Sequence, residues 1–250
     1  MGNRRKPTGA KVHRPAASAD RVVIGYLHPG EVSGYFCQSL VNMLMYDQAT
    51  DRRVVGCLNE WSSANVSNSR NDICRQFFER DAEWLLFVDA DMMFPHDAIN
   101  RLIKGADADA RPILGGLCFG INKGVLFPTL YVFHDGEKGP TTARVPEYPE
   151  NTIIPVAATG AAFLMIHRRV LEAFLERGFS EAFPFFQESE LSGEPAGEDI
   201  TFCLRAGTLG FPVHVDTGLH IGHHKSMVLT HEMFQQQRAA AHATLTEEGP

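Results

Sequence analysis

The amino-acid sequence predicts an α/β protein in which a mostly parallel, doubly wound sheet is flanked by helices and followed by a smaller mixed half. Three observations support this fold class. The chain has 250 residues, 44% of them hydrophobic, which is enough material for one domain with a sizeable core. Strand-like and helix-like segments alternate over roughly the first 120 residues, the order that produces parallel βαβ units. Beyond Leu117, short strand-like runs are separated by turns rich in glycine and proline, which indicates a mixed α+β arrangement.

The first half begins with a strand, a helix and a second strand. Residues 21–27 are β-branched and apolar, and they stop at the turn signal His28-Pro29-Gly30. Helices are expected over 34–48 and 67–80, because their apolar side chains recur every three or four residues. Residues 52–59 form the second predicted strand. The helix positions expected to face inward are Phe36, Leu40, Met43, Leu44, Ile73, Phe77 and Phe78.

The second half contains shorter strands and two more helices. An amphipathic helix is expected over 168–178, where Gly178 closes it, and another over 199–210, which ends in Gly210. A strand over 211–216 follows the second of these helices. Three further strand-like runs cover residues 125–133, 152–158 and 161–167.

Charge is distributed unevenly along the chain. The formal net charge is −7, yet residues 1–21 hold six Lys or Arg against one acid, which leaves 17 basic against 29 acidic side chains on the remainder. An acidic body excludes a non-specific nucleic-acid binder, because phosphate contacts need clustered cations. Residues 1–20 are expected to form a disordered basic tail, with docking to an anionic partner as the alternative.

The chain is expected to divide into this tail, a single domain over 21–230, and a frayed polar helix or tail over 231–250. No stretch approaches the roughly 18 apolar residues of a membrane span. The N-terminus also lacks the apolar centre of a secretion signal, so a cytoplasmic protein is expected. The cysteines occur singly, without a CxxC pair, and are expected to be reduced and buried; they are Cys37, Cys57, Cys74, Cys118 and Cys203.

The sharpest local feature is an acidic pair, Asp89 and Asp91, at the end of an apolar run over residues 84–88. Such a run indicates a strand covered on both faces. Alternate residues of an extended chain point the same way, so both carboxylates can converge on one cation, and Mg²⁺ or Mn²⁺ suits such hard oxygen ligands. In open α/β sheets, ligands bind at the carboxyl ends of strands. A solvated turn is the alternative, whereas an EF-hand is excluded because Phe94 stands where glycine is needed.

This stretch resembles the DxD motif of GT-A glycosyltransferases, in which hydrophobic residues precede Asp-x-Asp. The resemblance implies that Asp91 and Asp89 hold a divalent ion, Mn²⁺ or Mg²⁺, against the diphosphate of a nucleotide-sugar donor. It also implies that Asp89 contacts the ribose.

A second acidic pair, Glu198 and Asp199, opens the helix expected over 199–210. With Arg205 beyond it and a Gly-aromatic pair before the next strand, the segment resembles the ED motif of glycosyltransferase family 2. The resemblance implies that Asp199 is the general base and that Glu198 orients it. The alternative is a helix N-terminus in which both acids only interact with free amides and the helix dipole. Arg205 is expected to pair with one of the two acids, with a direct role at the substrate as the alternative.

Three histidines, His220, His223 and His224, follow the strand expected over 211–216. GT-A enzymes often place the third protein ligand of the metal here, and the position favours His223 over His220. A zinc site made of the three histidines alone is the alternative, although their spacing matches no standard zinc pattern.

On the nucleotide side, the segment that ends in Arg70 and Asn71 resembles the ARN segment of the same family. The resemblance implies that Arg70 offers planar donors to phosphate or base and that Asn71 fixes the loop. A helix start capped by Ser67 or Asn68 is the alternative.

Two further positions are expected at the donor. The end of the first strand, from Gly25 to His28, is where the family meets the nucleotide base. Gly160 lies in a segment that resembles the small-residue loop beneath the donor sugar, where glycine allows close approach of the backbone.

The resemblance extends over residues 21–225 and implies a GT-A (Rossmann-like) fold with a smaller acceptor-side half. It implies transfer of a sugar from a UDP- or GDP-sugar to a hydroxyl, with inversion if Asp199 is the base. Met92 replaces a third acid and no QxxRW-type motif occurs, which disfavours processive transfer. The acceptor stays open among a protein, a nucleic-acid base and a glycan. Because the family includes bacteriophage proteins, a phage protein acting in the host cytoplasm is one expectation.

Two other functions remain open on the sequence. A nucleotidyltransferase acting on sugar phosphates shares the nucleotide-binding sheet and the metal chemistry, but residues 26–36 lack the glycine run expected after the first strand. A non-catalytic carbohydrate-binding or structural protein on the same fold is opposed by the intact acids at positions 89, 91, 198 and 199.

Overall fold

The computed structural model describes residues 19–62, 65–122, 124–136 and 139–226, together with the single positions 231 and 235. The tail expected over 1–20 and the C-terminal segment expected over 231–250 lie almost wholly outside the described residues. Across the described ranges, no helix is long and apolar enough to cross a membrane. The helices are α1 (Gly34–Ala49), α2 (Val66–Phe77), α3 (Ala98–Gly105), α4 (Arg168–Arg177) and α5 (Glu198–Thr208).

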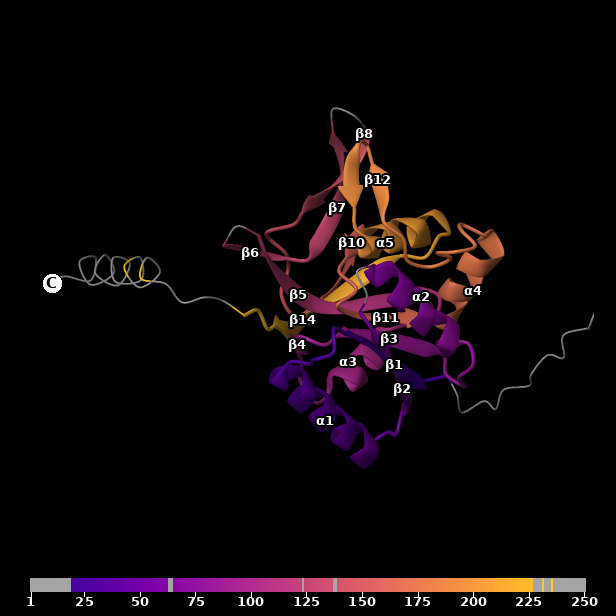
Figure 1. Ribbon diagram of the computed structural model, residues 1–250, viewed down its shortest axis with the longest axis vertical. Coiled ribbons are helices and arrows are strands. Elements are labelled where there is room, and N and C mark those ends of the chain that lie inside the picture. The colour runs from indigo at the N-terminus through magenta and orange to yellow at the C-terminus, as the bar shows by residue number, and fades with distance from the viewer. Residues whose placement is uncertain are drawn as a thin grey trace, which may run out of the picture.

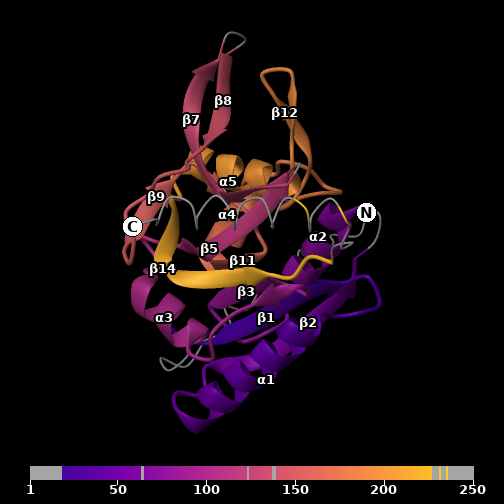
Figure 2. The ribbon, with the colours of Figure 1, turned by 90° about the vertical axis from the view of Figure 1, so that its left-hand side faces the viewer.

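A nine-stranded sheet forms the centre of the molecule (Figures 1 and 2). Its order is β2-β1-β3-β11-β5-β14-β4, with β6 paired to β5 and β9 paired to β14. The members of this sheet are β1 (Val22–His28), β2 (Val54–Trp61), β3 (Trp84–Asp89), β4 (Met92–Met93), β5 (Ile113–Asn122), β6 (Val125–Pro128), β9 (Ile153–Val156), β11 (Phe163–His167) and β14 (Val213–His223).

The parallel pairing predicted for the first half is present. β1 pairs in parallel with β2 and β3, and β5 pairs in parallel with β14. β11 lies between β3 and β5 and is antiparallel to both. Five strands therefore run in one direction, and β11 joins the α/β half to the mixed half.

Both faces of the sheet are covered, because β3 alternates its side chains between two cores. Leu85 and Phe87 pack with α2, α4 and α5, whereas Leu86 and Val88 pack with α1 and α3 on the other face. Figures 1 and 2 show the two groups of helices on opposite sides. Full burial of each such side chain contributes about 1.5–3 kcal/mol, so the two cores fix the end of β3 firmly.

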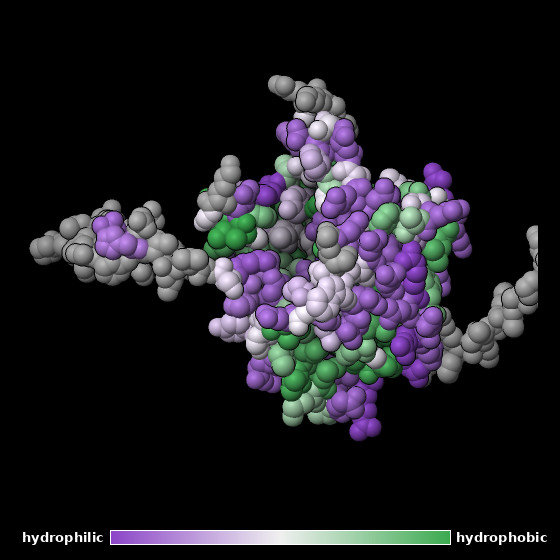
Figure 3. All heavy atoms as spheres, in the orientation of Figure 1, coloured by the Kyte–Doolittle hydropathy of each residue, from purple (hydrophilic) through white to green (hydrophobic). Residues whose placement is uncertain are grey.

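Helix α1 begins at the cap residue Ser33, whose Oγ accepts hydrogen bonds from the backbone N–H of Tyr35 and Phe36. Phe36 and Met43 are buried as predicted, while Leu40 and Leu44 are only half-buried. The outer face of this helix carries apolar side chains, and Figure 3 shows a hydrophobic patch over it. Its exposed apolar residues are Tyr35, Val41 and Met45.

Helix α2 is shorter than predicted at its C-terminal end. It runs from Val66 to Phe77 with Asn65 at the N-cap position, so Ser67 and Asn68 lie in its first turn and are not caps. Backbone N–H groups of residues 78–80 donate to carbonyls three residues earlier, which tightens the chain into turns and ends the helix.

In the second half, α4 ends at Gly178 in the left-handed conformation, as predicted. The strand expected over 211–216 is longer: β14 continues to His223 through an irregularity between Asp216 and His220. His220 and His223 therefore lie within the strand and do not follow it, which corrects the prediction. The pairing with β5 resumes at His220 after this irregularity.

The remaining strands form two small sheets, which project beyond α5 (Figure 2). These strands are β7 (Leu130–Gly136), β8 (Gly139–Arg144), β10 (Ala158–Thr159), β12 (Ser189–Leu191) and β13 (Glu194–Ala196). All five cysteine thiols are free, but Cys37 and Cys57 are exposed, so the expectation of burial holds only for the other three.

Candidate active site

A cavity of about 520 Å³ lies where the carboxyl ends of β1 and β3 meet the beginnings of α1 and α2. This is the edge of an α/β sheet at which ligands bind, and the volume is typical of a small-molecule site. Its polar lining comes from segments far apart in the sequence: Glu31, Ser33, Ser62, Arg70, Asp89, Asp91, His224, Lys225 and Ser226.

The two acids of the Asp-x-Asp sequence both line this cavity but have different partners. Asp91 Oδ2 lies 3.0 Å from His223 Nε2 and 2.8 Å from Lys225 Nζ. Asp89 Oδ1 instead accepts a hydrogen bond of 3.0 Å from Arg70 Nη2. Asp91 therefore faces β14, and Asp89 faces α2.

The ring of His223 is oriented from behind by a backbone carbonyl. Nδ1 lies 2.8 Å from the carbonyl oxygen of Phe119. This nitrogen therefore carries a proton and donates a hydrogen bond to the carbonyl. Nε2 then faces the Asp91 carboxylate, an arrangement that calls for a proton or a cation between the two atoms. The hydrogen bond with Asp91 raises the pKa of His223.

Asp91 is held in its ionised form by the same neighbours. Partial burial opposes its ionisation, but the hydrogen bonds from His223 and Lys225 outweigh this effect and lower the pKa of Asp91 to about 2. The carboxylate is therefore charged at neutral pH and available as a hard oxygen ligand.

These residues fit a divalent cation as a partial ligand set. Asp91 and His223 supply a carboxylate and an oriented imidazole, and Asp89 lines the same cavity. No group of three His, Cys, Asp or Glu side chains in the described part of the chain is arranged as a complete metal site. Substrate oxygens and water would complete the coordination, as is usual for Mg²⁺. His220 lines a separate hollow with Met93 and is not beside Asp91.

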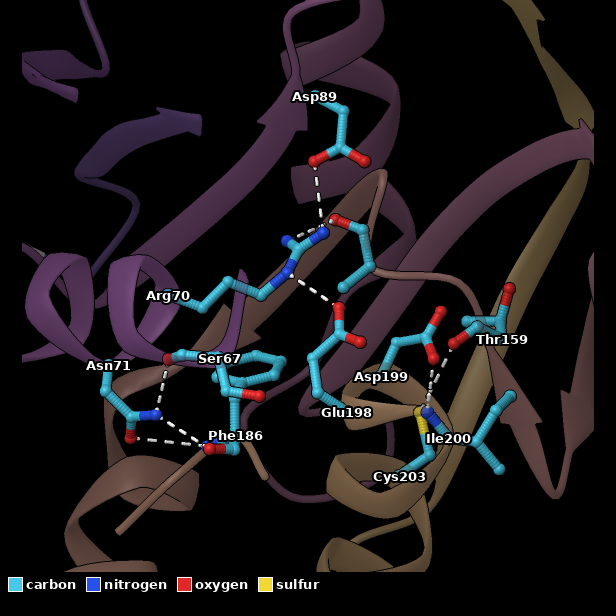
Figure 4. Close-up of polar contacts among 11 residues, drawn as sticks. Ser67, Arg70, Asn71, Asp89, Thr159, Phe186, Glu198, Asp199, Ile200 and Cys203 are labelled. Carbon is cyan, nitrogen blue, oxygen red and sulfur yellow. Dashed lines mark hydrogen bonds and ion pairs between the residues drawn. The ribbon is translucent and has the colours of Figure 1, made fainter. Parts of the chain in front are cut away.

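Arg70 is a buried bridge between the two acidic motifs (Figure 4). Its side chain is 4% exposed, and Nη2 donates to Asp89 while Nε donates to Glu198 Oε1 at 3.2 Å. Nη1 donates to the Ala161 carbonyl at 3.1 Å. Burial opposes its charge, but the surrounding carboxylates prevail and raise the pKa of Arg70. The guanidinium is thus engaged with protein groups, whereas the resemblance implied contacts to phosphate or base.

Asp199 lies in the first turn of α5, two residues after the N-cap residue Gly197. Its Oδ1 accepts a hydrogen bond of 2.7 Å from the backbone N–H of Ile200. Burial, reinforced by the neighbouring charge of Glu198, raises the pKa of Asp199 to about 6. Gly160 faces this carboxylate, since a Cβ on Gly160 would lie 3.6 Å from Asp199 Oδ2. The structure therefore joins Gly160 to the second acidic motif.

Arg205 does not pair with either acid of that motif, which corrects the prediction. It donates to Gln187 Oε1 at 2.7 Å and to the Phe183 carbonyl at 3.5 Å. Helix geometry explains this: Glu198 is seven residues away, about 10 Å along the axis, and Asp199 lies on another face of α5.

Asn71 stabilises the protein scaffold beneath the site. Its side chain is fully buried; Nδ2 donates to the carbonyls of Ser67 and Phe186, and Oδ1 accepts from the Phe185 N–H at 2.9 Å. It holds the backbone at Phe185 and Phe186 and does not line the cavity, whereas the resemblance implied a place beside the nucleotide.

The two positions on β1 that were expected at the donor, Gly25 and His28, lie in different surroundings. Gly25 is buried beneath α2, where a Cβ would lie 2.6 Å from Ile73 Cγ2, so it serves close packing of α2 on β1. His28 is half-buried, accepts a hydrogen bond from the Gly30 N–H and packs edge-on against Trp61. Its neighbours Leu27 and Pro29 line the cavity.

Lys225 contacts Asp91 at this site, although no expectation from the sequence named it. Its position two residues after His223 was the available signal, but only the fold shows that β14 brings it to Asp91. The role of the Phe119 carbonyl in orienting His223 has no signal in the sequence, because any residue supplies a carbonyl.

At the level of sequence, the chain matches no protein-family model and no curated protein. Solved structures do resemble it. A structure titled "A197 from STIV" superimposes with a TM-score of 0.51 at 18% identity, over 82% of this chain and 86% of A197. GalNAc-T7, a GT-A glycosyltransferase solved with UDP, GalNAc and Mn²⁺, superimposes with a TM-score of 0.50 at 12% identity. The protein has a GT-A-like fold.

The match to GalNAc-T7 extends over 81% of this chain but only 43% of that protein, so the chain spans less than half of its length. At these identities the likeness concerns the fold alone. Within this GT-A-like fold, the carboxyl edge of the sheet brings together the end of β3, the end of β14 and the start of α5.

Proposed function

We propose that the protein is a metal-dependent glycosyltransferase that moves a sugar from a UDP- or GDP-sugar to a hydroxyl acceptor. One observation carries the proposal: Asp91 and His223 face each other across 3.0 Å at the edge of a cavity of nucleotide size. The GT-A-like fold supports it, because GalNAc-T7, which shares that fold, was solved with UDP, GalNAc and Mn²⁺.

On the donor side, Asp91 and His223 would hold Mn²⁺ or Mg²⁺, with Asp89 close by. When bound, the divalent ion supplies the positive charge that stabilises a diphosphate leaving group. Ser33, the cap residue of α1, lines the same cavity, so the positive end of the helix dipole faces an anion bound there. Arg70 keeps Asp89 in place and limits the repulsion between carboxylates.

On the acceptor side, Asp199 would act as the general base. The acceptor oxygen forms its bond to the anomeric carbon as the bond from that carbon to the diphosphate oxygen breaks, and the hydroxyl proton passes to the Asp199 carboxylate. Attack from the side opposite the leaving group inverts the anomeric centre. Since the pKa of Asp199 is about 6, the base is ionised at neutral pH, and transfer should slow tenfold per pH unit well below 6.

The test is a screen of the purified protein against UDP-, GDP- and CMP-sugars, with and without Mn²⁺. We expect one donor to raise the melting temperature and to be hydrolysed slowly, and both effects to require the metal. Asp91→Ala should abolish them. Asp109→Ala, which changes an acid with a side chain 86% exposed on the loop before β5, should behave as the wild type.

The same assay separates the two halves of the mechanism. Asp199→Asn should lower transfer by about 10²- to 10⁴-fold and leave donor binding intact. Normal transfer in Asp199→Asn together with loss in Asp91→Ala would refute the base and retain the metal site. No response to any donor would favour a nucleotidyltransferase or a non-catalytic carbohydrate-binding protein.

A further inference from the structure

The side-chain nitrogens of His223 and Lys225 converge on one carboxylate oxygen at the edge of the cavity. Asp91 Oδ2 lies 3.0 Å from His223 Nε2 and 2.8 Å from Lys225 Nζ. A divalent ion held by Asp91 and His223 would need the same oxygen and the space beside it. The ammonium of Lys225 therefore stands where such an ion would bind.

The exposure of the two cations that line the cavity differs sharply. The side chain of Lys225 is 51% exposed, and Asp91 is its partner at this site, whereas Arg70 is 4% exposed and joined to three oxygens. An exposed ion pair contributes little to stability, so Lys225 can leave Asp91 at small cost. A buried guanidinium with several partners cannot move in this way.

The backbone that carries Lys225 is held in place. The N–H of His224 donates to the carbonyl of Asp91 at 2.8 Å, and the ring of His224 packs on Tyr35 at the start of α1. The main chain at His224 is thus tied to the segment just after β3, and the ring of this residue is in contact with α1. Movement of the ammonium can therefore come from rotation of the lysine side chain, which already lines the cavity.

The net charge of the cavity favours movement of the Lys225 ammonium from Asp91 to a bound anion. Glu31, Asp89 and Asp91 line it together with Arg70 and Lys225, so its formal charge is negative before an anion enters. A nucleotide diphosphate adds further negative charge and needs every cation available. An ammonium displaced from Asp91 would find its next partner in the diphosphate.

We propose that Lys225 exchanges partners: it neutralises Asp91 in the absence of a divalent ion, and it binds the donor diphosphate once the ion has taken its place. This inference rests on the proposed function. It makes Lys225 a competitor of the metal and a ligand of the nucleotide. Removal of its charge should therefore raise the affinity for the metal and lower the affinity for the nucleotide.

The experiment measures two affinities on the full chain. Binding of Mn²⁺ alone is followed by the electron paramagnetic resonance signal of free Mn²⁺, and binding of UDP and, in parallel, GDP at saturating Mn²⁺ by calorimetry. The variants are Lys225→Met, which keeps the length of the side chain without its charge, and Lys225→Arg, which keeps the charge. Lys104→Met, an exposed lysine on α3, is the matched control.

Lys225→Met should bind Mn²⁺ alone more tightly, by up to about fivefold, because an exposed ion pair no longer competes for Asp91. It should bind the nucleotide diphosphate more weakly, by about tenfold, because a cation is lost from the anion site. Lys225→Arg and Lys104→Met should stay close to the wild type in nucleotide binding.

Opposite shifts in the two affinities support the exchange, since a merely structural lysine would weaken both or neither. Mn²⁺ affinity that is unchanged or lower in Lys225→Met, or unchanged nucleotide affinity, overturns it while the metal site stands. If the wild-type protein binds neither Mn²⁺ nor a nucleotide diphosphate, the proposed function fails, and this inference fails with it.

Discussion

Asp199 combines two surroundings that oppose its ionisation: burial at the start of α5 and the adjacent carboxylate of Glu198. A surface aspartate has neither. Arg70 and the Ile200 N–H favour the charged form but do not restore an ordinary pKa. A carboxylate with a pKa of about 6 is a stronger base than a surface carboxylate and is still ionised at neutral pH, which suits proton abstraction.

This shift predicts how stability depends on pH. The folded-state pKa of Asp199 lies above its unfolded value, so its stabilising contribution is present at low pH and lost as the pH rises through about 6. Asp199→Asn removes that loss. The variant should therefore be more stable than the wild type at pH 8, by about 1–3 kcal/mol, with the difference vanishing towards pH 4.

Urea denaturation of the two proteins at pH 8 and at pH 4.5 measures this difference. Glu176→Gln, which changes an exposed acid on α4, is the control. A gap between Asp199→Asn and the wild type that is equal at both pH values would contradict the raised pKa.

At the scale of elements, α2 is the helix that ties the site together. Arg70 connects α2 to β3 through Asp89 and to α5 through Glu198, and the next residue, Asn71, holds the backbone at Phe186. One helix therefore positions β3 and α5 against each other.

Arg70→Met should destabilise the protein by about 2–4 kcal/mol, because it leaves two partly buried carboxylates without their counter-charge. Arg75→Met is the matched control on the same helix: its side chain is 47% exposed, and little change is expected. Chemical denaturation of both variants decides the matter. Equal, small losses would mean that the Arg70 bridge contributes no more than a surface ion pair.

Packing of α2 on β1 depends on the absence of a side chain at Gly25. A Cβ there would lie 2.6 Å from Ile73 Cγ2 and 3.3 Å from Leu85 Cδ1, both in the core. Gly25→Ala should cost about 1–3 kcal/mol by overpacking. Gly207→Ala on α5 meets no atom within 4 Å and should instead stabilise the protein by about 0.5–1 kcal/mol. Thermal denaturation should show melting temperatures that move in opposite directions; a shift in the same direction would argue against the close packing at Gly25.

At the scale of the whole molecule, one sheet separates two cores that share its strands. Phe186 stacks on Phe202 at 4.5 Å on the side of α2 and α5, and Met43 of α1 is buried on the other side. Every central strand contributes side chains to both cores. Disruption of either core should therefore unfold the whole protein.

Phe186→Ala and Met43→Ala should each lower the stability by about 2–5 kcal/mol and keep a single transition. Circular dichroism and the fluorescence of buried Trp84 on β3 should report the same midpoint in each variant. Midpoints that differ between the two probes would show that the faces unfold separately.

The sequence by itself determined the elements and the chemistry at their ends. The apolar run over 84–88, the closing Gly178 and the Asp89–Asp91 pair are local features, and local patterns of hydrophobicity and turn residues specify such elements without reference to the rest of the chain. The preference for His223 over His220 and the roles expected of the acids of α5 came from the family resemblance, and the structure places His223 beside Asp91.

The tertiary structure alone decided which of these groups meet. It turned Arg70 to Asp89 and Glu198, separated Arg205 from the acids, placed β11 between β3 and β5, and brought Lys225 to Asp91. These contacts join residues far apart in the chain, and they depend on how strands pair and how helices pack across the sheet. Strand pairing and helix packing minimise exposed apolar area for the whole molecule at once, so no local pattern encodes them.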